Sequence, residues 1–249
     1  MKDLSTITLI PIVLNREQIA NMSPDEMRRH IMLTSIMQDL VLLLKYLQFI
    51  GNNGHTGEAQ LKAYECQTLF HLSLLIAKSH EAWLFISNGK LLKPNEGRSQ
   101  KLGDAAKDVI SVFKDRKTTQ TFSFIRNKFG FHYDIENDLL PKVAKAAKSE
   151  DTLEMWLSEN ESGNDFFPST CKIIRSVILS EMQEQGFTGT QQEIMDKLFE
   201  SALDCVMKLL IFCRCYLAES FPEMWVEDDP VILKAPSMND VRLPYLVGR

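Results

Sequence analysis

The stretch Thr190-Gln191-Gln192-Glu193-Ile194-Met195-Asp196-Lys197-Leu198 carries the clearest folding signal in this chain. A threonine followed three residues later by glutamate is a capping box, in which each side chain bonds the other residue's backbone N–H at a helix start. Behind it, apolar residues recur at helical spacing: Ile194, Leu198, Leu203, Val206, Leu209, Leu210, Cys213 and Leu217. The sequence therefore predicts a long amphipathic helix from about residue 191 to residue 217.

A second capping signal, Ser23-Pro24-Asp25-Glu26, predicts the start of another long helix that ends at Gly51-Asn52-Asn53-Gly54. Further helices are expected at about residues 58–86, 104–113, 118–128, 139–148, 152–157 and 169–185. Because four of these helices are long and almost no strand pattern occurs, the predicted fold class is all-α, an antiparallel helical bundle with additional short helices.

The chain is predicted to form a single domain over residues 1–249, because no Pro/Gly/Ser-rich linker interrupts it. Its helical core would cover about residues 23–218, after an extended N-terminal segment at residues 1–22. Four prolines crowd into the last part of the sequence: Pro222, Pro230, Pro236 and Pro244. An irregular, extended C-terminal tail is therefore expected at residues 219–249.

Composition favours an ordinary soluble globular protein, with 45% apolar and 24% charged residues. Five cysteines without a paired pattern, and an N-terminus without the features of a secretory signal, predict a cytoplasmic protein with reduced thiols. The most apolar stretch, Leu40 to Leu44, is too short to cross a bilayer, so no membrane association is expected.

Charge is distributed unevenly along the chain. The total is −5, but residues 90–148 carry a net charge of +6 and residues 149–249 carry −10. A basic segment within an acidic molecule can attract an anionic ligand to one region. The alternative is that its lysines, such as Lys142, Lys145 and Lys148, form only the solvated face of a short helix.

The basic segment contains Ile125-Arg126-Asn127-Lys128-Phe129-Gly130-Phe131-His132-Tyr133-Asp134. A guanidinium fits phosphate oxygens and an imidazole transfers protons near neutral pH, so Arg126 and His132 could together cut a phosphodiester without a metal. On an unbroken helix, six residues rotate by about 600°, which leaves these side chains about 120° apart. Convergence therefore needs a break at Gly130 or a second subunit. Alternatively, Arg126 forms a surface ion pair and His132 caps the helix end.

The run Arg126-Asn127 … His132 on a helix resembles the R-x(4–6)-H signature of the HEPN family, and its surroundings are similar to the abortive-infection branch. Many HEPN proteins are metal-independent endoribonucleases that dimerise with the motif at the shared interface. The resemblance implies Arg126 as phosphate or transition-state ligand, His132 as general acid or base, and Asn127 as orienting partner. It also implies 2′-hydroxyl attack on the adjacent phosphate, giving a 2′,3′-cyclic phosphate without a cofactor.

The partners implied by this resemblance are RNA, a second copy of the chain and an antitoxin or regulatory protein, in a toxin or phage-defence setting. A second interpretation is a non-catalytic helical interaction module that dimerises or binds a protein through its acidic C-terminal part. A third, a small-ligand-binding helical protein, would need an apolar pocket with convergent polar groups.

Cys205, Cys213 and Cys215 lie on one predicted helix, with Cys215 expected to point away from the other two. Since no histidine lies near them, they are interpreted as buried structural thiols, and no metal site is expected. Phe129 and Phe131 flank Gly130, so one of them could face a dimer seam or an RNA base.

Overall fold

The computed structural model describes residues 4–9, 16–51, 57–92, 99–130, 139–157, 165–220, 231–236 and 241. Within these residues the chain forms eight α-helices, one π-helical turn and two short strands. Their bounds are β1 Leu4–Leu9, α1 Arg16–Asn21, α2 Pro24–Gly51, α3 Glu58–Asn88, α4 Gln100–Lys114, α5 Arg116–Ile125, η1 Arg126–Gly130, α6 Leu140–Lys148, α7 Pro168–Glu184, α8 Gln191–Ser220 and β2 Val231–Pro236. The predicted all-α class is confirmed.

Both predicted capping boxes form. The backbone N–H of Ser23 donates to the Glu26 carboxylate at 2.8 Å, and the N–H of Glu26 donates to the Ser23 hydroxyl at 3.3 Å. The N–H of Thr190 donates to the Glu193 carboxylate at 2.6 Å, and the N–H of Glu193 donates to the Thr190 hydroxyl at 3.2 Å. These reciprocal bonds satisfy backbone donors that a helix start otherwise leaves unpaired, so α2 and α8 begin where the sequence predicted.

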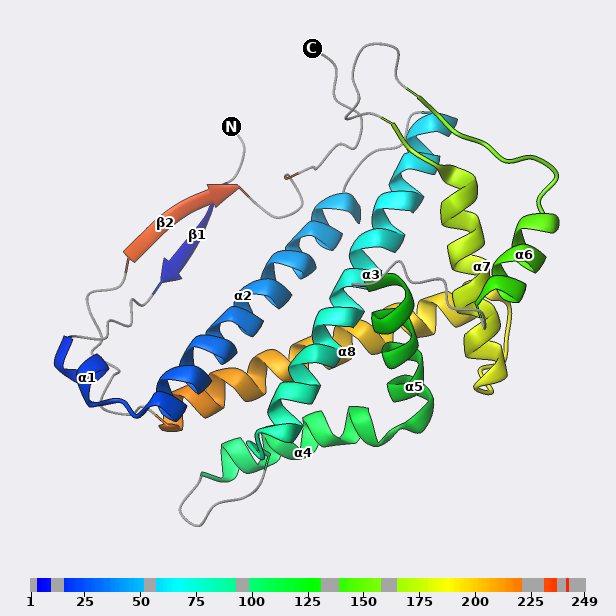
Figure 1. Cartoon of the computed structure of the whole chain (residues 1–249). Coiled ribbons are helices and arrows are strands. Elements are labelled where there is room, and N and C mark those ends of the chain that lie inside the picture. Colours follow the sequence, from blue (N-terminus) through cyan, green and yellow to red (C-terminus); the bar gives the residue numbers. More distant parts are fainter. Residues whose placement is uncertain are drawn as a thin grey trace.

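Helices α2 and α3 lie side by side and run in opposite directions, and α8 crosses both of them (Figure 1). Helix α8 is buried on several sides, and its side chains Ala202, Val206, Leu209 and Phe212 are each completely buried. The rest of the hydrophobic core gathers around it from α2, α3, α4, α5 and α7.

The three cysteines of α8 are buried, which confirms their interpretation as structural thiols. Burial raises the pKa of Cys205 and of Cys213 to about 12, so both stay protonated. Cys215, expected on a different face of this helix from the other two, is buried as well, because α8 is covered on several sides.

The two ends of the chain pair with each other. Strand β1 runs antiparallel to β2, with Leu4 opposite Pro236 and Leu9 opposite Val231. The expected irregular tail is therefore a strand at residues 231–236, and residues 16–21 of the expected extended N-terminal segment are helical. Each strand supplies backbone partners that the other needs, so neither forms from local sequence preference alone.

Two other expectations differ from the structure. Residues 152–157 are not helical, because Trp156 and Phe166 exchange two backbone hydrogen bonds of 2.9 Å and stack their rings at 5.5 Å. Helix α4, expected from about residue 104, begins at Gln100, because the Ser99 hydroxyl accepts from the backbone N–H of Leu102 at 3.2 Å and caps the helix.

Among the described residues, α2 alone is long and apolar enough to cross a membrane by length and composition. Core helices of soluble proteins meet the same criterion. On the side that faces the other helices, α2 buries Leu33, Leu40, Leu47 and Ile50.

The chain changes its helical winding at the predicted motif. Helix α5 ends at Ile125, and Arg126–Gly130 form one π-helical turn that packs on α3. At Gly130 the backbone approaches α3 so closely that an added Cβ would overlap the Cβ of Ala77. Gly130 is thus needed for close packing, and this contact sets the position of the whole π turn against α3.

We expect Gly130→Ala to lower the free energy of unfolding by about 1–3 kcal/mol, because the extra methyl overpacks the α3 contact. Urea denaturation measures this change. Ala77→Gly in the same chain should recover part of the loss, since it removes the atom that the new methyl meets.

Gly103→Ala is the matched control, because a Cβ at this position in α4 meets nothing within 4 Å. It should stabilise the protein by about 0.5–1 kcal/mol through helix propensity. Equal effects of the two glycine substitutions would contradict the packing role of Gly130.

Candidate functional site

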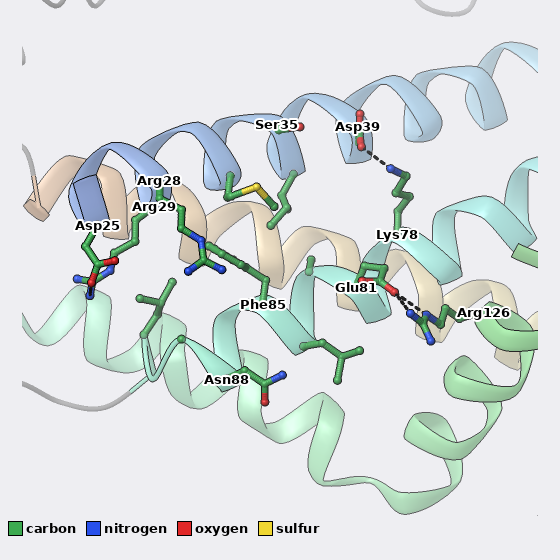
Figure 2. Close-up of a pocket in the computed structure, with 16 residues that line it drawn as sticks. Asp25, Arg28, Arg29, Ser35, Asp39, Lys78, Glu81, Phe85, Asn88 and Arg126 are labelled. Carbon is green, nitrogen blue, oxygen red and sulfur yellow. Dashed lines mark hydrogen bonds and ion pairs between the residues drawn. The ribbon is translucent and has the colours of Figure 1, made fainter. Parts of the chain in front are cut away.

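Arg126 is the first residue of the π turn, and its side chain is 29% exposed. Its Nε donates to a Glu81 carboxylate oxygen at 2.5 Å, and its Nη2 pairs with the same oxygen. Glu81 comes from the C-terminal third of α3, about one turn after the Ala77 that Gly130 contacts, and faces Arg126 (Figure 2). The ion-pair alternative for Arg126 is therefore realised, with a partner on another helix.

Asn127 lies next to this pair and is exposed. The Nη1 of Arg126 donates to the Asn127 side-chain oxygen at 2.6 Å, and the Asn127 amide donates to the Ser123 hydroxyl at 3.4 Å. The structure thus brings Arg126 and Asn127 together. Among the described residues, three of the five guanidinium N–H donors are engaged, and one on each Nη has no partner there.

Two residues that the sequence analysis singled out, His132 and Phe131, lie outside the described residues. Phe129, the other aromatic residue beside Gly130, is half-buried and packs edge-on against Phe124 with ring centroids 5.8 Å apart. Lys142 is not a freely solvated lysine, because it forms ion pairs with Glu181 at 2.8 Å and with Glu184 at 2.7 Å.

A groove of about 910 Å³ runs between α2 and α3, and Arg126 lies at one of its ends (Figure 2). Arg28 and Arg29 of α2 lie at the opposite end. The middle of the groove is largely apolar, with Met32 and Phe85 on its walls. Its other lining residues are Asp25, Ser35, Ile36, Asp39, Lys78, Glu81, Ala82, Leu84, Asn88, Gly89 and Leu91.

The charges along this groove are mostly paired. The pairs are Lys78 with Asp39 at 2.8 Å, Arg29 with Asp25 at 3.6 Å, and Arg126 with Glu81. Arg28 makes no ion pair with any part of the chain that the structure describes. Since four cationic and three anionic side chains line the groove, its formal net charge is +1.

Sequence reasoning missed the groove and the partner of Arg126. Glu81 precedes Arg126 by 45 residues. No local pattern marks Glu81, Lys78 or Arg28 as members of one site, because only the packing of α2, α3 and η1 brings them together. The adjacent arginines Arg28 and Arg29 near the start of α2 are the only sequence signal that could have suggested a cationic patch.

His80 lies directly before Glu81 on α3 and is buried, with its ring edge-on to Phe113 at 6.5 Å between centroids. Within the described ranges its Nδ1 has no hydrogen-bond partner. Burial lowers the pKa of His80, and the nearby Arg126 charge lowers it further. His80 is therefore a neutral core histidine behind the site and does not line the groove.

Searches against protein-family models, curated proteins and solved structures find no match to this chain. In the part of the molecule that the structure describes, no group of three or more His, Cys, Asp or Glu side chains could hold a metal ion. The candidate site therefore consists of Arg126, its partners Glu81 and Asn127, and the groove that Arg126 borders.

We expect wild-type stability to fall more steeply than that of His80→Leu as the pH drops below about 6.5, the ordinary histidine pKa. Because the pKa of His80 is lowered in the folded state, the unfolded chain takes up its proton first. The stabilising contribution of His80 is therefore fully present above pH 6.5. It is lost as the pH falls toward the pKa of His80 in the folded protein. Urea denaturation between pH 5 and pH 8 measures the difference between the two proteins.

Arg126→Gln should make this pH dependence weaker, since it removes the second cause of the pKa shift. Parallel pH profiles for wild type and His80→Leu would contradict the assignment of His80 as a buried neutral histidine.

Proposed function

We propose that this chain is a metal-independent endoribonuclease of the HEPN type, which acts in the cytoplasm as a toxin or phage-defence effector. One observation carries the proposal. Arg126, the arginine of the motif, is held by Glu81 and Asn127 at the end of an open groove, and two of its N–H donors have no partner among the described residues.

In the proposed reaction, the 2′-hydroxyl of RNA attacks the neighbouring phosphorus and the bond to the 5′-oxygen breaks. The products are a 2′,3′-cyclic phosphate and a free 5′-hydroxyl. The two remaining donors of Arg126 bind non-bridging oxygens, where negative charge grows in the transition state. RNA supplies the nucleophile itself, so the proposal assigns no step to a metal or a cofactor.

Asn127 and Glu81 are positioning residues in this scheme. Asn127 restricts the guanidinium plane through Nη1, and Glu81 holds Nε and Nη2 from the opposite side. A guanidinium that is already oriented loses less conformational entropy when a phosphate arrives. Removing either partner should therefore weaken catalysis without removing the charge of Arg126.

His132 is proposed as the general acid that protonates the leaving 5′-oxygen, or as the base that accepts the 2′-hydroxyl proton. For this role its ring must reach the phosphate bound at Arg126. One route is a change of chain direction at Gly130, because glycine commonly ends a helix. A homodimer in which a second copy supplies the imidazole is the other route to the same geometry.

The second candidate function is a non-catalytic helical module that binds a protein partner. It is favoured by the fact that Arg126 already has a carboxylate partner in Glu81, as a purely structural arginine would. An antitoxin or regulatory protein remains a proposed partner under either function.

We expect Arg126→Ala and His132→Ala each to reduce RNA cleavage by about 100-fold or more, and Asn127→Ala by about tenfold. Arg126→Ala removes charge stabilisation, His132→Ala removes proton transfer, and Asn127→Ala removes an orienting contact. Cleavage of a labelled single-stranded RNA in the presence of EDTA measures the rate, and mass spectrometry identifies the cyclic phosphate.

Lys107→Ala is the control, because this exposed lysine of α4 pairs with Asp104 on its own helix and does not line the groove. Its cleavage rate should equal that of the wild type. If Arg126→Ala and His132→Ala both cleave at the wild-type rate while keeping their helicity and oligomeric state, the enzyme proposal fails. A wild-type protein that does not cleave RNA would favour the interaction module.

A further inference from the structure

We infer that the groove between α2 and α3 holds a single-stranded RNA segment, with one phosphate at Arg126 and a second, several nucleotides away, at Arg28. This inference rests on the proposed function, because it assigns the reacting phosphate to Arg126. It adds a binding role for α2, which lies outside the motif.

The length of the groove fits more than one nucleotide. Arg28 and Asp39 are eleven positions apart on α2, which corresponds to about 16 Å along a helix axis. Asp39 is paired with Lys78, one helical turn before the Glu81 that holds Arg126. A stacked nucleic-acid strand advances about 3.4 Å per nucleotide, so this span covers roughly five stacked nucleotides and fewer extended ones.

The walls of the groove suit a single strand. An arginine lies at each end, Arg126 paired with Glu81 and Arg28 without a carboxylate partner among the described residues, and the middle is apolar, with half-buried Phe85 on one wall (Figure 2). Proteins that bind single strands combine a positive groove that follows the backbone with aromatic rings on which bases stack. The polar side chains of Ser35 and Asn88 also face this space, where base edges would lie. Double-stranded RNA is instead recognised by shape, through contacts across its wide, shallow minor groove.

Arg28 is the side chain best suited to the second phosphate. Arg29, Lys78 and Arg126 each have a carboxylate partner, whereas Arg28 has none among the described residues. Its positive charge is therefore not offset locally. In Figure 2 one of the two guanidinium groups at this end lies beside Asp25, and the other is directed along the groove toward Phe85.

The test measures binding of the full-length protein to a 2′-O-methyl RNA hexanucleotide, which lacks the attacking hydroxyl and cannot be cleaved. Fluorescence anisotropy over a series of salt concentrations gives the Kd and its salt dependence. Arg28→Ser should raise the Kd by about fivefold to tenfold at 50 mM salt. It should also reduce the slope of log Kd against log salt by about 0.7, the value for one phosphate contact on a single strand.

Arg28→Lys should keep most of the affinity, because it preserves the charge. Lys45→Ser is the matched control, since Lys45 is an exposed cation on the same helix that does not line the groove. For a dinucleotide, which cannot reach both ends, Arg28→Ser and wild type should bind equally.

Equal Kd and equal salt slopes for wild type, Arg28→Ser and Lys45→Ser would overturn the inference, even if Arg126→Ala abolishes cleavage. Absence of binding by the wild type would also overturn it. If Arg28→Ser weakens binding but the wild type does not cleave unmodified RNA, the groove remains an RNA-binding site and the nuclease proposal fails. A protein ligand that binds the groove and is not displaced by the hexanucleotide would favour the interaction module.

Discussion

The arrangement of the candidate site depends on one steric contact, the approach of the Gly130 backbone to Ala77 of α3. Only a residue without a side chain allows the two backbones to come this close. The contact places the π turn alongside α3, and Arg126 at its start can then reach Glu81. It also positions Arg126 at the end of the groove, so a packing constraint in the core determines where the positive charge lies.

Ion pairs along the groove are better understood as orienting interactions than as sources of stability. Partly exposed pairs contribute about 0–1 kcal/mol each, because water screens the charges and side-chain entropy opposes the contact. The Lys78–Asp39 pair, whose side chains are both more than a third exposed, belongs to this class. Arg126–Glu81 is less exposed on the arginine side and is supported by Asn127, which restricts the guanidinium further. An anionic ligand could exchange with such pairs without a large cost to the fold.

Features that depend on local chemistry could be predicted from the sequence. The capping boxes at Ser23 and Thr190 and the helices behind them required only spacing rules, because their hydrogen bonds join residues three positions apart. The neighbouring residues Arg126 and Asn127 could also be placed together. Their roles in catalysis stay a prediction, as does the convergence of Arg126 with His132.

Features that depend on distant contacts could not be predicted. The strand at residues 231–236 forms through its pairing with β1. Trp156 becomes extended because it meets Phe166. Glu81 joins the site only through the packing of η1 on α3, and the groove needs both α2 and α3 to exist. Each of these contacts links separate segments of the chain, and no periodicity within either segment predicts them.

The pairing of β1 with β2 has a consequence for how the protein matures during synthesis. Strand β1 leaves the ribosome long before its partner β2 is made, because all the helices lie between the two strands in the sequence. The backbone groups of β1 that pair with β2 must therefore wait while the intervening helices assemble. Closure of so long a loop is slow, and unpaired strand edges can join to those of other chains in the meantime. The ribbon of β1 and β2 should consequently reach its native arrangement after the helices between its two strands.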